Sequence, residues 1–376
     1  MGIVFFKTWF WKELTVITMK KRFFCGYSVG EDALNSFKEI CMPLGKRVLV
    51  IGGEKALAAA KEKLAAAFYP YFEIVDTVLY GNECSKKRAE ELALLYKDST
   101  VDFVVGVGGG KALDTAKCTA HLLKKSVVTV PTIASTCAAT SALSVVYTEN
   151  HTFSEFWHYE KPAYHCFIDT EIISKAPIGY LRAGIGDTVA KFYETEFSAR
   201  GRKKGYSDQM ALSVAAMCRE PLMESAVSAL SLCSEGKTGE SLETAARIIL
   251  VSTGMVSMMI NPKFNGAVAH ALFYGLTEID GFEESFLHGD VVGYAAIVQL
   301  LLDGQTEEAK RLKRFLKDIG IETTLSERGI KVERSVFEKV LPAALKDPDM
   351  EIVPYEITED MLYNAILEAE GLEEEK

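Results

Sequence analysis

The chain has 376 residues, of which 42 are basic and 52 are acidic, so its formal net charge is −10. Hydrophobic residues make up 48% and charged residues 25%, a mixture typical of folded globular proteins that excludes a disordered, collagenous or coiled-coil chain. The acidic excess argues against a protein built to bind the phosphate backbone of nucleic acids. At roughly 150 residues per domain, the length predicts two or three domains.

The N-terminus and the cysteines favour a cytoplasmic protein. The first residues are apolar but are interrupted by Lys7, Lys12 and Glu13, which makes a poor signal peptide. The longest apolar run, about Val291 to Leu302, is far shorter than the roughly 20 residues of a membrane span. The eight cysteines show no CxxC spacing, which is typical of reduced thiols. We therefore expect a cytoplasmic protein that has neither a membrane nor a nucleic acid as its partner.

Strand-like and helix-like segments alternate in the first half of the chain. The β-branched runs predicted as strands are 47–51, 72–79, 102–107 and 126–130. The segments predicted as helices between them are 56–68, 85–96, with Ser85 as N-cap, and the stretch from Lys111 to about Leu123. This alternation predicts a parallel, doubly wound sheet.

The second half of the chain is helical in character. Helical periodicity extends over 181–198, 207–233, 241–260 and 291–302. We therefore predict an α/β domain over residues 1–175 and an all-helical domain over residues 176–376.

A glycine loop follows the third predicted strand and opens a helix, in the segment Gly108-Gly109-Gly110-Lys111. Glycines let the backbone approach a pyrophosphate, and the free N–H groups of a helix start face the anion. A tight strand-to-helix turn is the alternative interpretation. The segment 131–136, which contains small hydroxyl residues, follows the next strand, where doubly wound sheets bind ligands. Together the two segments predict nucleotide binding.

Three side chains of the helical half form a candidate metal site. Asp187 lies early in a long predicted helix, and His270 and His288 have apolar neighbours further along the chain. A single buried histidine is more often a hydrogen-bonded core residue than a metal ligand. Two histidines and an aspartate together, however, make a three-ligand site with an open position, which suits a catalytic divalent ion. The other histidines, at 121, 151, 158 and 165, are interpreted as structural or surface residues.

These motifs resemble those of the iron-containing (group III) alcohol dehydrogenase superfamily, in its glycerol dehydrogenase-like branch. The matching segments are 106–117, 130–136, 141–147, 184–187, His270 with 275–277, and 288–289. The resemblance implies a Rossmann-like N-terminal nucleotide-binding domain with a parallel sheet, an all-helical C-terminal domain that carries the metal, and a cleft between them, as in the dehydroquinate synthase-like fold. It also implies a homo-oligomer that acts on a small molecule.

The resemblance further implies the ligands and the residues that hold them. One divalent ion, Zn²⁺ or Fe²⁺, is expected on Asp187, His270 and His288. NAD or NADP is expected on Gly53, Gly109, Gly110, Lys111, Asp114, Thr132, Ser135, Ser141, Leu143 and Tyr147. The substrate is expected near Cys137, Lys191 and Tyr274.

Within this branch, the segments 136–139 and 186–191 are more similar to hydroxycarboxylate dehydrogenase A-like members than to glycerol dehydrogenases. Cys137 stands where glycerol dehydrogenases carry an aspartate that contacts the polyol, which argues against glycerol. Phe273 and Tyr274 stand where many members carry another histidine, which argues against a histidine proton relay. Gly53 stands where many NAD-selective relatives carry an aspartate, so we expect NADP to be tolerated.

The sequence thus predicts a reversible oxidoreductase for a small secondary alcohol and its ketone, with the metal as Lewis acid and the nicotinamide as hydride carrier. Lys191 lies one helical turn after Asp187 and offers an ammonium group to a substrate carboxylate, and Cys137 removes a charge that would repel it. The expected substrate is therefore a 2-hydroxy or 2-oxo acid. The alternative is a glycerol dehydrogenase, in which Lys191 points to solvent or pairs with Glu194 and Cys137 only packs.

Two alternatives come from other classes. A dehydroquinate synthase-like lyase shares the fold, NAD and metal, but it would need a denser basic pocket for a phosphorylated substrate than Lys191 provides. A pseudoenzyme that binds nucleotide for oligomer assembly is disfavoured by the intact Asp187, His270 and His288.

Overall fold

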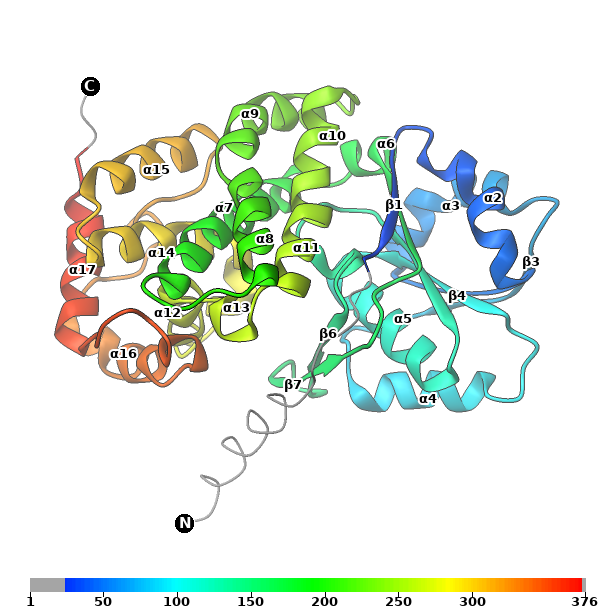
Figure 1. Ribbon diagram of the computed structural model, residues 1–376, viewed down its shortest axis with the longest axis horizontal. Coiled ribbons are helices and arrows are strands. Elements are labelled where there is room, and N and C mark those ends of the chain that lie inside the picture. Colours follow the sequence, from blue (N-terminus) through cyan, green and yellow to red (C-terminus); the bar gives the residue numbers. More distant parts are fainter. Residues whose placement is uncertain (1–23, 374–376) are drawn as a thin grey trace, which may run out of the picture.

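The computed structural model describes residues 24–373, so the N-terminal segment that we interpreted as a poor signal peptide lies outside the described residues. Two parts of the chain lie side by side: a sheet flanked by helices, and a group of packed helices (Figure 1). The last strand of the sheet ends at Asp169, and every element described after it is helical. The domain boundary that we predict at 175–176 falls between helices α6 and α7.

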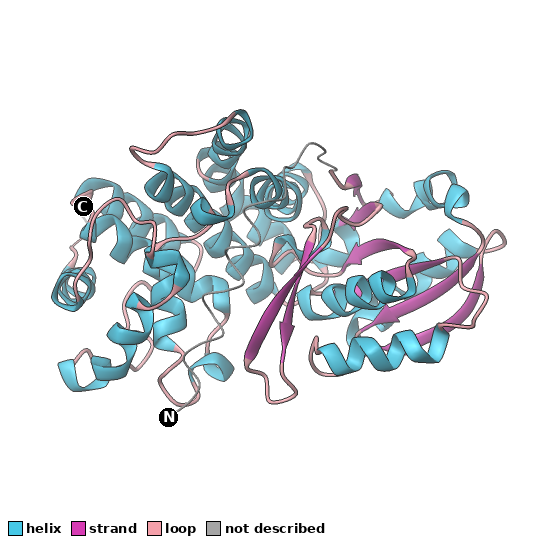
Figure 2. Ribbon diagram, turned by 60° about the horizontal axis from the view of Figure 1, so that its bottom comes forward, coloured by secondary structure: helices cyan, strands magenta, loops and turns pink. Residues whose placement is uncertain are grey.

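The main sheet is parallel and six-stranded, with the order β1-β8-β5-β4-β2-β3. Its strands are β1 (Gly26–Gly30), β2 (Arg47–Gly52), β3 (Glu73–Leu79), β4 (Phe103–Gly108), β5 (Ser126–Pro131) and β8 (His165–Asp169). The sheet confirms the predicted fold class, and β2 to β5 match the four predicted strands within a few residues. The sequence analysis missed β1, β8 and the antiparallel hairpin of β6 (Leu143–Tyr147) and β7 (Phe153–His158) (Figure 2).

Helices cover both faces of this sheet, which is why its central strands are apolar throughout. The helices of this half are α2 (Phe37–Cys41), α3 (Glu54–Phe68), α4 (Lys86–Tyr96), α5 (Gly110–Leu123) and α6 (Thr170–Ser174). Along β2, Val48 and Val50 pack with α2 and α3, whereas Leu49 and Ile51 pack with α4 and α5. Successive side chains of a strand point to opposite faces of the sheet, so a strand with helices on both faces has a continuous apolar sequence.

The second half consists of eleven named α-helices among the described residues. They are α7 (Ile178–Ala199), α8 (Tyr206–Ala215), α9 (Glu220–Ser234), α10 (Glu240–Arg247), α11 (Thr253–Met259), α12 (Val268–Leu276), α13 (Phe282–Ser285), α14 (His288–Leu302), α15 (Thr306–Asp318), α16 (Phe337–Leu345) and α17 (Glu359–Gly371). The single helix predicted over 207–233 was wrong. The helix is interrupted at Arg219, and Pro221 lies in the first turn of α9, where a missing N–H costs little.

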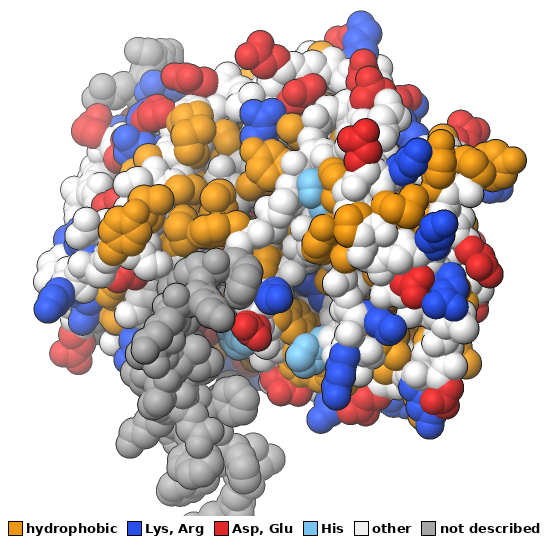
Figure 3. All heavy atoms as spheres, turned by 45° about the vertical axis from the view of Figure 1, so that its right-hand side comes forward, with side chains coloured by type: hydrophobic (Ala, Val, Ile, Leu, Met, Phe, Trp, Pro, Cys, Tyr) orange, Lys and Arg blue, Asp and Glu red, His pale blue; other side chains and the backbone are white. Residues whose placement is uncertain are grey.

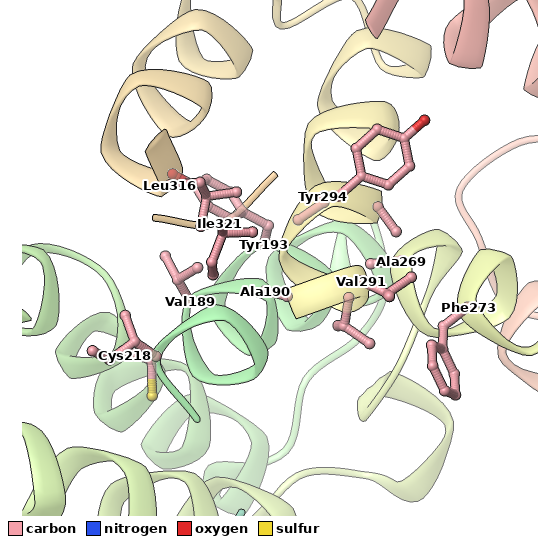
Figure 4. Packing of buried hydrophobic residues seen from close by; sticks show 14 of the residues in the cluster. Val189, Ala190, Tyr193, Cys218, Ala269, Phe273, Val291, Tyr294, Leu316 and Ile321 are labelled. Atoms are coloured by element: carbon pink, nitrogen blue, oxygen red, sulfur yellow. The ribbon is translucent and has the colours of Figure 1, made fainter. Parts of the chain in front are cut away.

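The core of the helical half lies where α7, α12 and α14 meet. Figure 4 shows Val189 and Ala190 of α7, Phe273 of α12, and Val291 and Tyr294 of α14 among the packed side chains. Almost all of α14 is buried, and a helix that is apolar on every side must be enclosed by its neighbours. These three helices are therefore held rigidly against one another.

One stretch, Glu240–Met259, is long and apolar enough to cross a membrane by length and composition alone. It comprises α10, a π-helical segment (Ile248–Ser252) and α11, and 61% of its most apolar 18-residue window is buried inside the protein. A core helix has the same properties, so this stretch is weak evidence for a membrane span. The apolar run predicted from the sequence was the shorter one that forms α14.

On the face drawn in Figure 3, basic and acidic side chains are interspersed over the α/β half.

Candidate metal and nucleotide site

The structure brings together the three residues predicted as metal ligands. Asp187 lies on α7, His270 lies on α12, and His288 is the first residue of α14. Their ligand atoms all lie within 4.8 Å of one another. Nε2 of His270 lies 3.5 Å and Nε2 of His288 lies 3.6 Å from Oδ1 of Asp187. Asp187 thus meets two histidines that lie more than 80 positions further along the chain, because the three buried helices that carry these residues form one core.

The donor set and its spacing fit a divalent transition metal. Two imidazole nitrogens and one carboxylate oxygen are ligands that suit zinc or iron, and three protein ligands leave a position open. Ligands about 2.0–2.1 Å from a tetrahedral ion lie roughly 3.3 Å apart, close to the two nitrogen–oxygen distances of this site. The residues therefore fit the ion that the resemblance implies.

Electrostatics favours a cation at this position. Burial raises the pKa of Asp187, but the neighbouring imidazoles of His270 and His288 outweigh it and hold the pKa well below its ordinary value. Burial lowers the pKa of His270, but the charge of Glu194, the nearby Asp187 carboxylate and the hydrogen bond to Glu194 raise it to about 10. A proton and a metal ion compete for Nε2 of His270. The carboxylates of Asp187 and Glu194, which stabilise the protonated ring, therefore also attract a metal ion to this position.

Glu194 is a part of this site that the sequence analysis mentioned only as a partner for Lys191. It is fully buried on α7, and its Oε2 lies 2.6 Å from Nδ1 of His270. Burial raises its pKa, but the charge of His270 and its hydrogen bond outweigh that effect, so the net pKa is lowered. The available signal was an acidic residue seven positions after Asp187, on the same face of an apolar helix.

Lys191 lies one turn after Asp187 and is only 7% exposed. Its Nζ donates a hydrogen bond to the backbone carbonyl of Asn265 at 2.5 Å. The alternative in which Lys191 points to solvent was therefore wrong, and Glu194 is hydrogen-bonded to His270 instead. Burial raises the pKa of the Cys137 thiol, Lys191 lowers it and Asp187 raises it, so these three groups lie within electrostatic range.

Tyr274, the third residue expected near the substrate, lies on α12 and is 38% exposed. Its neighbour Phe273 packs edge-on against the ring of His288, with the ring centroids 4.3 Å apart. Phe273, three residues after His270, thus provides an apolar contact for the ring of His288.

The two loops predicted to bind nucleotide lie side by side at the carboxyl edge of the sheet. Gly109 is the N-cap of α5, and Gly110 is its first residue. The N–H of Thr132 donates to the carbonyl of Gly108 at 3.1 Å, which ties the segment after β5 to the segment after β4. A Cβ on Gly109 would come within 2.7 Å of Ile133. The backbone therefore makes a tight cradle at the start of a helix, which fits a pyrophosphate.

Polar side chains around this cradle are already paired. Nζ of Lys111 lies 2.6 Å from Oε2 of Glu83 and 5.3 Å from the ring centre of Tyr147. Glu83 is buried and also accepts a hydrogen bond from His151, on the turn of the β6–β7 hairpin. Glu83 could not be recognised from the sequence, because its partners Lys111 and His151 come from two other segments.

Asp114 and Lys117 tie α5 to the hairpin. The two charges lie 2.8 Å apart, and burial raises the pKa of Asp114 while Lys117 partly offsets that effect. Asp114 accepts a hydrogen bond from the N–H of Val145. Lys117 donates to the backbone carbonyl of Leu143 and lies 3.5 Å from the hydroxyl of Ser141. These contacts hold Ser141 and the strand β6, which carries Leu143 and Tyr147, against the helix that follows the glycine loop.

Gly53 lies at the same edge of the sheet, between β2 and α3. A Cβ at this position would lie 3.3 Å from the ring of Tyr80. The next residue, Glu54, is the first residue of α3.

The metal and nucleotide parts meet at Gly184, on the first half of α7. A Cβ on Gly184 would lie 2.3 Å from the carbonyl oxygen of Ala134 and 3.0 Å from Cα of Ser135. The helix that carries Asp187 therefore lies directly against the loop that carries Thr132 and Ser135.

Comparisons with known proteins show the family to which the chain belongs. The family model for iron-containing alcohol dehydrogenases matches residues 26–170. A glycerol dehydrogenase of Thermotoga maritima is 35% identical over 81% of this chain and 83% of its own length. Hydroxycarboxylate dehydrogenase A of Escherichia coli is 33% identical over 86% of this chain and 90% of its own length.

A solved structure of glycerol dehydrogenase from Schizosaccharomyces pombe superimposes with a TM-score of 0.84 at 27% identity, covering 94% of this chain and 91% of that one. The chain belongs to the iron-containing alcohol dehydrogenase family. It is an oxidoreductase that acts on CH–OH groups with a nicotinamide cofactor, which argues against the lyase and pseudoenzyme alternatives.

Proposed function

We propose that this protein is a metal-dependent, NAD(P)-linked oxidoreductase that interconverts a small 2-hydroxy acid and the corresponding 2-oxo acid. The observation that carries the proposal is the position of α7. This helix bears Asp187 and Lys191 and contacts the nucleotide loop at Gly184. A hydride donor on the loop and an ion on the helix would thus face the same small space.

Different residues of the chain would bind the ion, bind the dinucleotide and exclude water. Asp187, His270 and His288 would hold the ion, which when bound supplies a Lewis acid for the substrate oxygen. The backbone at Gly109 and Gly110, with Thr132 and Ser135, would bind and orient the dinucleotide. Phe273 would limit the access of water to His288.

Lys191 supports an acidic substrate. A lysine ammonium has three donors, and the hydrogen bond to Asn265 uses one of them. The group is buried, so a charge-assisted hydrogen bond to a substrate carboxylate would be stronger than at the surface. Cys137, within electrostatic range of Lys191, brings no permanent negative charge to compete for it.

The side chain of Asn265, whose backbone carbonyl accepts the hydrogen bond of Lys191, supports a hydroxylated substrate. Its side-chain Oδ1 is buried and has no hydrogen-bond partner among the described residues. Buried acceptors are nearly always hydrogen-bonded, so this atom suits a donor supplied by a ligand, such as a hydroxyl group.

Glycerol remains the second candidate, and two observations favour it. Several relatives are named glycerol dehydrogenases, including those of Thermotoga maritima and Citrobacter freundii. In addition, Asp349 lies within electrostatic range of Lys191, and burial raises the pKa of this carboxyl to about 6. An ionised Asp349 would compete with a substrate carboxylate for Lys191.

The substitution Lys191→Met tests the choice of substrate. We expect kcat/KM for 2-oxobutyrate to fall by roughly 10- to 100-fold, because a charge-assisted hydrogen bond contributes about 1.5–3 kcal/mol. The rate with dihydroxyacetone should change much less. A matched control is Lys313→Met, since Lys313 is also buried and also donates to backbone carbonyls, at Ala369 and Leu372. A wild-type preference for the uncharged substrate that Lys191→Met leaves unchanged would return the chain to the glycerol dehydrogenases.

The remaining features of the proposal follow from the resemblance and the sequence. We propose that NADP is accepted beside NAD, that the ion is Zn²⁺ or Fe²⁺, and that the enzyme is a cytoplasmic homo-oligomer. The division into residues 1–175 and 176–376 belongs to the same proposal. Metal analysis of the purified protein and its mass in solution test the ion and the oligomer directly.

A further inference from the structure

We infer that Glu194 is a positioning residue, which fixes the ring of His270 so that Nε2 is the nitrogen that faces the metal. The inference rests on the proposed metal site and adds a group that does not itself touch the ion. Glu194 lies on the same helix as Asp187, seven residues further on, so one helix would supply both a ligand and the support for a second ligand.

The contacts of Glu194 account for both of its carboxylate oxygens. Oε2 lies 2.6 Å from Nδ1 of His270. Oε1 accepts the backbone N–H of Ala267 at 3.0 Å and that of His270 at 2.9 Å. These two N–H groups lie at the start of α12, where a helix has unpaired donors and a partial positive charge. One carboxylate therefore fixes both the beginning of the helix and the ring that projects from it.

This geometry selects one form of the imidazole. An ionised carboxylate only accepts hydrogen bonds, so Nδ1 of His270 must carry the proton. When a metal ion takes the place of the second proton, the lone pair is on Nε2, which lies 3.5 Å from Oδ1 of Asp187. A carboxylate behind a histidine ligand fixes its tautomer and raises its basicity toward a metal.

The two histidines differ in this respect. His270 is mostly buried and is held by a carboxylate, whereas His288 is more exposed and packs against the ring of Phe273. We therefore expect His270 to be the ligand whose orientation is fixed before the ion binds.

The substitution Glu194→Gln tests the inference. The glutamine carbonyl can still accept the two backbone N–H groups, but its NH₂ group would face Nδ1 and place the imidazole proton on Nε2. We expect the affinity for Zn²⁺, and for Co²⁺ followed by its visible spectrum, to fall roughly 10- to 100-fold. Thermal unfolding in chelator and binding of NADH should change little.

A matched control is Glu308→Gln. Glu308 accepts a hydrogen bond from Tyr193 of α7 at 2.7 Å, so this variant also removes a carboxylate that supports α7. It should leave the metal affinity unchanged. If Glu194→Gln fails to fold, ¹⁵N-histidine NMR of the Zn²⁺-loaded wild-type protein replaces it, with His270 expected to carry its proton on Nδ1 and to bind through Nε2.

Two outcomes separate the inference from the proposed function. The first outcome is that the wild-type protein binds metal, that His270→Ala does not, and that Glu194→Gln binds it as tightly as wild type. This outcome would leave the metal site in place and overturn the role of Glu194. Binding of the ion through Nδ1 of His270 would overturn it as well. If wild type binds no divalent ion, the metal site and the role of Glu194 both fall.

Discussion

The two halves of the molecule build their parts of the site in different ways. In the α/β half, the candidate nucleotide site consists mainly of backbone from two short loops, after β4 and after β5, which one hydrogen bond joins. In the helical half, the candidate metal site consists of side chains from α7, α12 and α14, which the chain brings together over long separations.

This difference decides how each part responds to substitution. A site made of backbone depends on space, so most side-chain changes leave it intact and an added Cβ disturbs it. A site made of converging side chains depends on each of them, because each ligand supplies a group that its neighbours cannot replace. The three predictions that follow test this contrast, from the largest expected effect to the smallest.

The largest effect is expected for His270→Ala. Loss of a ligand should lower kcat/KM by about three orders of magnitude or more, because a metal ion contributes several kcal/mol of transition-state stabilisation. Binding of NADH, measured by fluorescence titration, should stay near the wild-type value, since the nucleotide loops are formed by the other half. Incubation of the wild-type enzyme with a chelator should reproduce the loss, and added Zn²⁺ or Fe²⁺ should restore activity to wild type alone. Full activity of His270→Ala in chelator would contradict the site.

A smaller effect that spans both halves is expected for Gly184→Ala. Its Cβ would overlap the carbonyl of Ala134, so α7 or the loop must move, and overpacking of this kind costs about 1–3 kcal/mol. We expect a lower midpoint of urea unfolding and a higher KM for the nucleotide.

The control for Gly184→Ala is Gly371→Ala, at the end of α17, where an added Cβ meets nothing within 4 Å. This variant should unfold like wild type. Equal unfolding midpoints for the two variants would show that α7 and the loop are not in firm contact.

The smallest effect is expected for Gly53→Asp, which tests the choice of cofactor. A carboxylate at the end of β2 would bind a ribose 2′-hydroxyl and repel a 2′-phosphate, so the ratio of kcat/KM for NAD over NADP should rise roughly tenfold. The Tyr80 ring, 3.3 Å from the new Cβ, must shift by a few tenths of an ångström, which limits the gain. Glu54→Gln shows whether the neighbouring acid already performs this role. A wild-type preference for NAD above about a hundredfold would contradict the expected tolerance of NADP.

Elements that depend on local sequence patterns could be predicted from the sequence. The strands β2, β4 and β5 have buried, β-branched runs, whereas the edge strand β3 is mostly exposed and was predicted from its β-branched residues. The N-cap of α4 at Ser85 is confirmed by its hydrogen bond from Arg88. The edge strand β1 gave no such signal, because it is short, half-exposed and bounded by Gly26 and Gly30. The break between α8 and α9 was visible in principle at Pro221, which cannot continue a helix.

The parts that depend on contacts between distant segments could not be predicted in the same way. The residues proposed as metal ligands were chosen from their residue types and from a resemblance, but their convergence rests on how three helices pack. The direction of Lys191 is fixed by the carbonyl of Asn265, and the partner of Glu194 is fixed by the position of α12. Helical periodicity gives the face on which a side chain lies, but not the group that it meets.

The contact of Gly184 with the nucleotide loop makes α7 a spacer of defined length. Gly184 and Asp187 are three residues apart, which is a rise of about 4.5 Å along a helix. Hydrogen bonds within the helix keep this rise constant, so motion of exposed side chains does not change it. If the hydride donor lies beside Gly184 and the metal ion beside Asp187, the reacting carbon and oxygen of the substrate must fit within this rise, which is less than one helical turn. Selectivity for small substrates would then depend on backbone geometry. Enlarging the surrounding pocket would not by itself admit a secondary alcohol with bulkier groups on its reacting carbon.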